Sequence, residues 1–350
     1  MTSTPRLIGS FALAAVILVS CTRIGSGGAA PSSAEIYAAG PTVSEVRTLF
    51  GDSNWWPGPP SFEVRPLDAA ETPFTQRFSI TQRFLHIGSA EEFDIRYTVY
   101  DKTSSATTRM TAAQNSFGAS PTSPKEGDQV LYYGLVSSGG APYITRTYVR
   151  LGQVVAEILW SRKDGIPTVT QLGRNAAKVV AGLKRVTAGK VHPSPVIVSP
   201  TQLPPAGLDI TLLGSTELPI EAWLVMADVA IPGPVATLLH GQGVDTFVFA
   251  DYALNRDTHM EVRAALLTFA SATDATDWVN TFGPGTIDQN GISSGYLDNV
   301  GEYHYLIATG KTGAMLVCRS TIDTEAASRA CESPMERTAI AWKLGLSGVV

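Results

Sequence analysis

The segment 188–207 contains five prolines and lies between two parts of the chain of similar length. The prolines are Pro193, Pro195, Pro200, Pro204 and Pro205. Proline lacks a backbone N–H donor and disfavours helix interiors and central strands, so this segment favours an extended, polyproline-like connection. We therefore predict two domains, residues 42–187 and 208–350, joined by a proline-rich linker at 188–207.

The first domain shows alternating and helical patterns in a definite order. Phe93, Ile95, Tyr97 and Val99 alternate with other residues as one face of a strand would. Apolar positions at helical spacing then lead to Phe117, and Gly118 follows where a C-terminal cap is expected. The predicted elements are strands over 93–100, 129–134, 143–150 and 153–160, and helices over 106–117 and 170–186.

The second domain repeats this order of strand pair, helix, strand pair and helix. We predict strands over 246–254, 259–269, 295–306 and 314–319, with a helix over 271–282. A closing helix is predicted to begin with Ser333 as N-cap, Pro334 at the first helical position and Glu336 completing a capping box.

The repeated order predicts an α+β fold of two similar modules, each an antiparallel sheet packed by helices. Internal duplication explains the repetition economically. Chance similarity between two α+β domains is the alternative.

The N-terminus carries an apolar run from Leu7 to Val19. This run is shorter than the roughly 20 residues that span a bilayer, and it follows a short segment with one cation, as in a signal peptide. We predict that residues 1–20 are removed. Residues 21–41 are mostly small and polar, so we expect a flexible tether there.

Leu18, Val19, Ser20 and Cys21 end the apolar run. This tetrapeptide resembles the lipobox of bacterial lipoproteins, and the resemblance covers the first 21 residues. It implies that Cys21 receives diacylglycerol, that cleavage occurs before it, and that the protein is exported and anchored on the extracytoplasmic side of a membrane. An ordinary secretory signal with an incidental cysteine is the alternative.

Cys318 and Cys331 are the two remaining cysteines. Export would place them in an oxidising compartment, so we expect a disulfide between them. Closing a loop of this length contributes about 3 kcal/mol by restricting the unfolded chain. A zinc site is less favoured, because no histidine or second cysteine pair lies nearby in the sequence.

Residues 291–295 match the G-x-S-x-G pattern of a hydrolase nucleophile elbow, with Ser293 at its centre. His304 and Asp298 are hypothetical partners. An elbow requires a strand before the serine and a helix after it, whereas a strand-like segment follows here, so we favour a simple turn. Residues 310–312 read GKT but lack the earlier glycine of a phosphate-binding loop. The five histidines form no metal-binding motif, and we expect neither metal nor cofactor.

Trp55 and Trp56 lie on a segment rich in proline and glycine. Paired tryptophans can stack on sugar rings or peptide prolines, so both are candidate ligand-binding residues. We favour the alternative that their rings cover the edge of the core.

Charge excludes one class of function. The formal net charge is -5, and no basic run is present, so the sequence offers no footprint for nucleic acid. We expect a non-enzymatic, lipid-anchored envelope protein that binds a ligand or partner, such as an envelope protein, a glycan or a lipid. The alternatives are a carrier of an apolar ligand, a serine hydrolase using Ser293, and a structural role.

Overall fold

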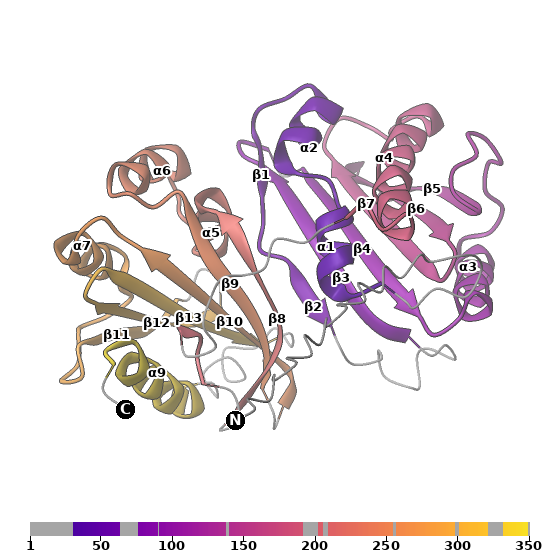
Figure 1. Ribbon diagram of the computed structural model, residues 1–350. Helices are drawn as coiled ribbons and strands as arrows, with labels where there is room; N and C mark the ends of the chain where they lie inside the picture. Colours follow the sequence, from indigo (N-terminus) through magenta and orange to yellow (C-terminus); the bar gives the residue numbers. More distant parts are fainter. Residues whose placement is uncertain are drawn as a thin grey trace, which may run out of the picture. The chain divides into compact units, whose positions relative to one another are not determined.

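The computed structural model describes most of the chain as a mixed α+β protein with two antiparallel sheets (Figure 1). The described residues are 31–63, 76–89, 91–137, 140–191, 202–205, 209–254, 257–297, 301–320 and 332–348. Cys21 and the predicted signal peptide lie outside these ranges. The predicted fold class is confirmed.

Among its described residues, the first module contains one sheet and four helices. The strands are β1 (Trp55–Pro57), β2 (Ser61–Glu63), β3 (Gln76–His86), β4 (Glu92–Tyr100), β5 (Gln129–Ser137), β6 (Gly140–Leu151) and β7 (Val154–Arg162). The helices are α1 (Ser33–Ala39), α2 (Val43–Phe50), α3 (Thr103–Phe117) and α4 (Val169–Thr187). The strand order is β1-β3-β4-β7-β6-β5, and β2 pairs with β3.

The second module contains the other sheet. Its strands are β8 (Ile210–Pro219), β9 (Thr246–Leu254), β10 (Asp257–Thr268), β11 (Ile292–Leu297), β12 (Glu302–Thr309) and β13 (Thr312–Ser320). Its helices are α5 (Ile220–Met226), α6 (Pro232–Gly241), α7 (Ala272–Phe282) and α9 (Glu332–Leu346). The strand order is β11-β12-β13-β10-β9-β8.

The two modules share one topology. In the first, β3 and β4 precede a helix, three strands follow, and their order in the sheet is 3-4-7-6-5. In the second, β9 and β10 precede α7, three strands follow, and the order is 9-10-13-12-11. The closing helices α4 and α9 occupy equivalent places in the two sequences of elements. Topology thus agrees with the repeated pattern read from the sequence.

Amphipathic helices cover the sheets, because the apolar stripe of each must be buried. On α4, Leu172, Ala176, Val179 and Leu183 are all buried. Helix α1 packs against α4 where Gly182 allows close approach, since a Cβ there would lie 2.0 Å from the Ala39 carbonyl oxygen. In Figure 1, α1 and α4 lie across the same sheet.

Three boundaries differ from expectation. The predicted tether extends to residue 41, but Ser33–Ala39 form α1, whose Ile36 is fully buried, so ordered structure begins earlier. Helix α9 begins at Glu332, which places Ser333 inside the helix and not at its N-cap. The single strand predicted over 295–306 is two strands, β11 and β12, paired antiparallel.

Within the described part of the chain, no helix combines the length and apolar character needed to cross a bilayer.

Candidate functional site

Trp55 is part of the aromatic core of the first module. It is 2% exposed, and its ring lies 4.8 Å from Phe50 and 5.4 Å from His86. Trp56, its neighbour on β1, is half-buried. Phe50 also contacts Trp160 at 4.7 Å. Trp55 therefore packs in the core of the first module, and a ligand would contact only the part of its ring that is not covered by the other aromatic side chains.

A cavity of about 500 Å³ adjoins this aromatic cluster. It is bounded by the end of α2, the turn between β3 and β4, the end of β7 and the start of α4. Phe50, Trp55 and Trp160 supply its apolar side, while most of its other lining side chains are polar. We call this cavity the donor pocket.

Three lining residues of the donor pocket carry buried N–H groups that lack a hydrogen-bond partner. They are the Trp160 Nε1, the Arg162 Nε and the Asn175 Nδ2. Trp160 and Asn175 are only 5% and 2% exposed. Leaving a buried donor unpaired costs about 1–3 kcal/mol, so three around one cavity make it a candidate ligand site. These nitrogen atoms have almost no accessible surface, so a ligand with acceptor oxygens would satisfy them once the side chains turn toward the cavity.

The charges around the donor pocket are of both signs. Arg162 lies over the Trp160 ring, with its Cζ 4.9 Å from the ring centroid. Lys163 and Arg174 add exposed cations, and acidic side chains, Asp52 among them, also line the cavity. This mixture fits a polar or zwitterionic ligand better than a strongly charged one.

Sequence reasoning found only Trp55 of this site. One signal was available: Asn175 interrupts the apolar stripe of α4, where a polar side chain must find a partner or remain unsatisfied. Arg162 and Trp160 come from the end of β7, and nothing in their local sequence distinguishes them from ordinary strand-end residues.

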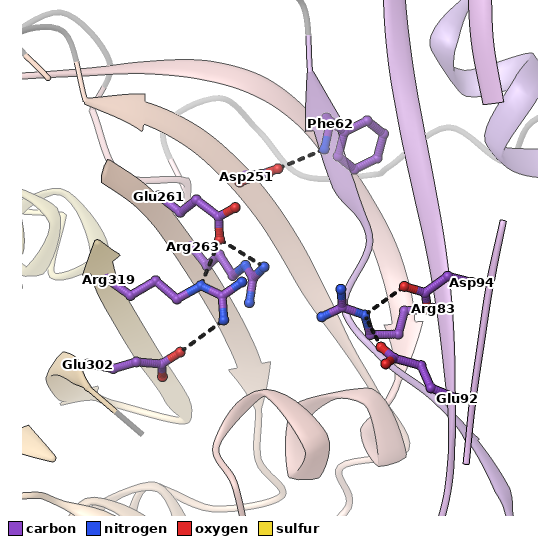
Figure 2. Close-up of polar contacts among 9 residues, drawn as sticks. All are labelled: Phe62, Arg83, Glu92, Asp94, Asp251, Glu261, Arg263, Glu302 and Arg319. Atoms are coloured by element: carbon purple, nitrogen blue, oxygen red, sulfur yellow. Dashed lines mark hydrogen bonds and ion pairs between the residues drawn. The ribbon is translucent and has the colours of Figure 1, made fainter. Parts of the chain in front are cut away.

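A second polar cluster lies on β9, β10, β12 and β13, and we call it the charge network (Figure 2). Cross-strand register creates it, because Arg319 is paired with Glu261 on one side and with Glu302 on the other. Arg319 Nε donates to Glu261 Oε2 at 2.7 Å, and Arg263 lies 3.2 Å from the same carboxylate. Glu302 Oε2 also accepts a hydrogen bond from His304 Nε2 at 2.8 Å.

The charge network reaches the first module through Asp251. Its Oδ2 accepts the backbone N–H of Phe62 on β2 at 2.8 Å. Burial raises the pKa of Asp251 to about 7, and the Arg263 charge partly offsets that rise. On the first module, burial likewise raises the pKa of Asp94, which pairs with Arg83, to about 7. Every charged side chain in the network has a partner or an opposite charge beside it, which indicates that the network has a structural role.

Ser293 and His304 occupy neighbouring strands but are engaged elsewhere. Ser293 is buried in β11, and its hydroxyl donates to the Gly285 carbonyl oxygen at 2.9 Å. His304 is bonded to Glu302. Ser293 lies inside a strand, so the residues around it do not form the strand-turn-helix of a nucleophile elbow. Asp298 lies outside the described residues.

Cys318 is fully buried on β13, within the core beneath α9. Cys331 lies outside the described ranges, so the pairing of the two stays a prediction. Among the residues that the structure describes, no group of three or more metal-ligating side chains is gathered.

The fold defines an α+β protein of two antiparallel-sheet modules, with a polar pocket in the first. No protein-family model matches the chain, and no curated protein does. Among solved structures, it is similar to the extracellular domain of PknH from Mycobacterium tuberculosis, with 14% identity, a TM-score of 0.37, and coverage of 44% of this chain and 98% of that one. DynU16, a putative protein in the dynemicin biosynthetic locus, matches with 12% identity, a TM-score of 0.12, and coverage of 84% and 98%. Similarities this distant do not identify the ligand of the donor pocket.

Proposed function

We propose that this chain is an exported, lipid-anchored envelope protein that binds a small polar ligand in the donor pocket. The observation that carries the proposal is the set of unpaired buried donors on Trp160, Arg162 and Asn175. A ligand with carbonyl, carboxylate or hydroxyl oxygens would accept from them, while a ring or short apolar part would rest on the aromatic side. Such hydrogen bonds would offset the cost of the unpaired donors and so favour binding.

A polar ligand is favoured over the apolar cargo of a lipid carrier. An apolar ligand would leave the same three donors unsatisfied and would also desolvate Arg162. A smaller cavity of about 270 Å³, lined in part by Pro41, Pro57 and Phe84, is more apolar, but its lining shows no comparable set of unpaired donors. The donor pocket is therefore the better candidate.

Removing one donor tests ligand binding. We expect Trp160→Phe to weaken ligand binding about tenfold, or about 1.4 kcal/mol, because the ring is kept while the Nε1 donor is lost. Thermal-shift screening against small carboxylates, phosphates and sugars would find a ligand, and calorimetry would measure its affinity.

Trp278→Phe is the matched control, because Trp278 also has a buried, unpaired Nε1 but lies on α7 and not in the donor pocket. Its affinity for the ligand should equal that of the unmodified protein. Equal affinities for all three proteins would contradict the assignment of the donor pocket.

Cys21→Ala tests the lipid anchor. We expect the variant to lose lipid incorporation and cleavage, because only the Cys21 thiol can form the thioether that carries the acyl chains. Metabolic labelling with a fatty acid, followed by detergent phase partitioning, measures both effects. A variant that still incorporates the label and stays with the membrane would exclude Cys21 as the anchor.

A further inference from the structure

Three side chains on the wall of the donor pocket form a continuous hydrogen-bond chain, which we call the Ser89 relay. Ser89 Oγ lies 2.8 Å from His86 Nδ1, and His86 Nε2 lies 2.9 Å from Asp52 Oδ2. All three residues line the cavity. A serine hydroxyl bonded to an imidazole, which is bonded in turn to a carboxylate, is the connectivity that activates a serine nucleophile, here with the two ring nitrogens exchanged relative to the Ser-His-Asp triad.

The direction of the hydrogen bonds follows from the chemistry of Asp52. The backbone N–H of Asn54 and then the bond to His86 lower the pKa of Asp52, so this side chain is a carboxylate and can only accept. The His86 hydrogen is accordingly assigned to Nε2. In the neutral imidazole, Nδ1 then holds a lone pair facing the Ser89 hydroxyl, as a general base requires.

Backbone pairing holds the Ser89 relay together. His86 ends β3 opposite Trp55, and the Ile87 N–H donates to the Asn54 carbonyl oxygen at 2.9 Å, which fixes the Asp52 segment beside the turn. Gly88 has φ of 92°, a left-handed conformation that lets Ser89 fold back over His86. The Trp55 ring meets the imidazole edge-on.

We propose that Ser89 is a nucleophile for acyl transfer and that the donor pocket hydrolyses a small polar ester. Ser89 Oγ attacks the carbonyl carbon while its proton passes to His86 Nδ1, and the carbonyl electron pair moves onto oxygen. When the carbonyl re-forms, the carbon–oxygen bond to the leaving alkoxide breaks and that alkoxide takes the proton from His86. Water then attacks the acyl-serine and gives a proton to His86, which returns it to Ser89 as the carboxylic acid leaves.

Asp52 is the positioning residue of the relay and remains a carboxylate throughout. The two ring nitrogens belong to one conjugated system, so the charge gained at Nδ1 strengthens the bond that Nε2 makes to Asp52. The unpaired donors on Trp160, Arg162 and Asn175 would bind the acceptor oxygens of the ester. The inference thus rests on the donor pocket being the ligand site.

A fluorophosphonate probe tests the inference on the full chain, exported and purified in detergent. We expect phosphonylation at Ser89, located by peptide mass spectrometry, and none in Ser89→Ala. His86→Gln should lower the labelling rate on the order of a hundredfold. Asp52→Asn should lower it on the order of tenfold, less than in a buried triad because the Asp52 side chain is 39% exposed.

Ser44→Ala is the control, because Ser44 is an exposed serine on α2 outside the pocket, and its labelling should be unchanged. Circular dichroism would establish that each variant is folded. An unlabelled Ser89, labelling at Ser293 instead, or equal rates in His86→Gln would overturn the inference. A ligand that binds Ser89→Ala and the unmodified protein equally, with Ser89 inert to the probe, would reject the hydrolase and leave the binding proposal intact.

Discussion

Asp251→Ala is expected to lower the free energy of unfolding by about 3 kcal/mol at pH 7. The substitution removes the acceptor of the buried Phe62 N–H and leaves the buried Arg263 with less compensating charge. Urea unfolding followed by fluorescence would measure the loss. Asp251→Asn keeps an acceptor oxygen of the same shape, so its loss should be much smaller; equal losses would show that the Phe62 contact contributes little.

Asp251→Asn should also change how stability depends on pH. The pKa of Asp251 is about 7 in the folded protein against 3.8 for an unperturbed side chain, so between these values the folded state binds the extra proton. Its contribution favours folding at low pH and is lost as the pH rises through 7. The asparagine side chain cannot titrate, so the decline in stability from pH 5 to 8 should be shallower in the variant than in the unmodified protein. Parallel curves of stability against pH for the two proteins would contradict the raised pKa. Asp94 remains in both proteins and contributes equally to each.

Trp342→Ala is expected to lower the free energy of unfolding by about 3–5 kcal/mol. Trp342 is 1% exposed in the core between α9 and its sheet, so the substitution leaves a large cavity. Its Nε1 also donates to the Gln202 carbonyl oxygen at 2.8 Å, which attaches part of the predicted linker to the second module.

Trp342→Phe separates these two contributions, because the ring is largely retained while the donor is lost. We expect a smaller loss than for alanine, measured by the same denaturant titration. A loss below about 1 kcal/mol for Trp342→Ala would show that α9 is not an integral part of this core.

Elements with strong periodicity were predictable from the sequence alone. Strand β9 (Thr246–Leu254) and helix α7 (Ala272–Phe282) lie where the patterns placed them. Helix α5 was missed, because Ile220–Met226 is a short and nearly continuous apolar run, which fits a buried strand as well as a helix. Strand β8 was missed because its apolar residues do not alternate with polar ones in the sequence, and its burial in the structure does not alternate either.

The candidate site was much less predictable. The one serine motif in the sequence drew attention to Ser293, whose hydroxyl is bonded to the Gly285 carbonyl oxygen. Ser89 belongs to no recognised motif, and the carboxylate of its relay, Asp52, lies 34 positions before His86. Asp52 and His86 are brought together only by the pairing of β1 with β3, which no local sequence pattern reveals.

The sequence by itself determined the class of fold and the strongly periodic elements that recur in both modules, because these depend on neighbouring residues within a few turns or strand repeats. The anchor at Cys21 stays a prediction from the sequence. Only the tertiary structure decided the donor pocket, the Ser89 relay and the charge network. Each joins side chains from separate strands and helices, and their distances are set by sheet register and helix packing. Asn175 and Asp251 acquire their significance from burial, which the rest of the fold imposes on them.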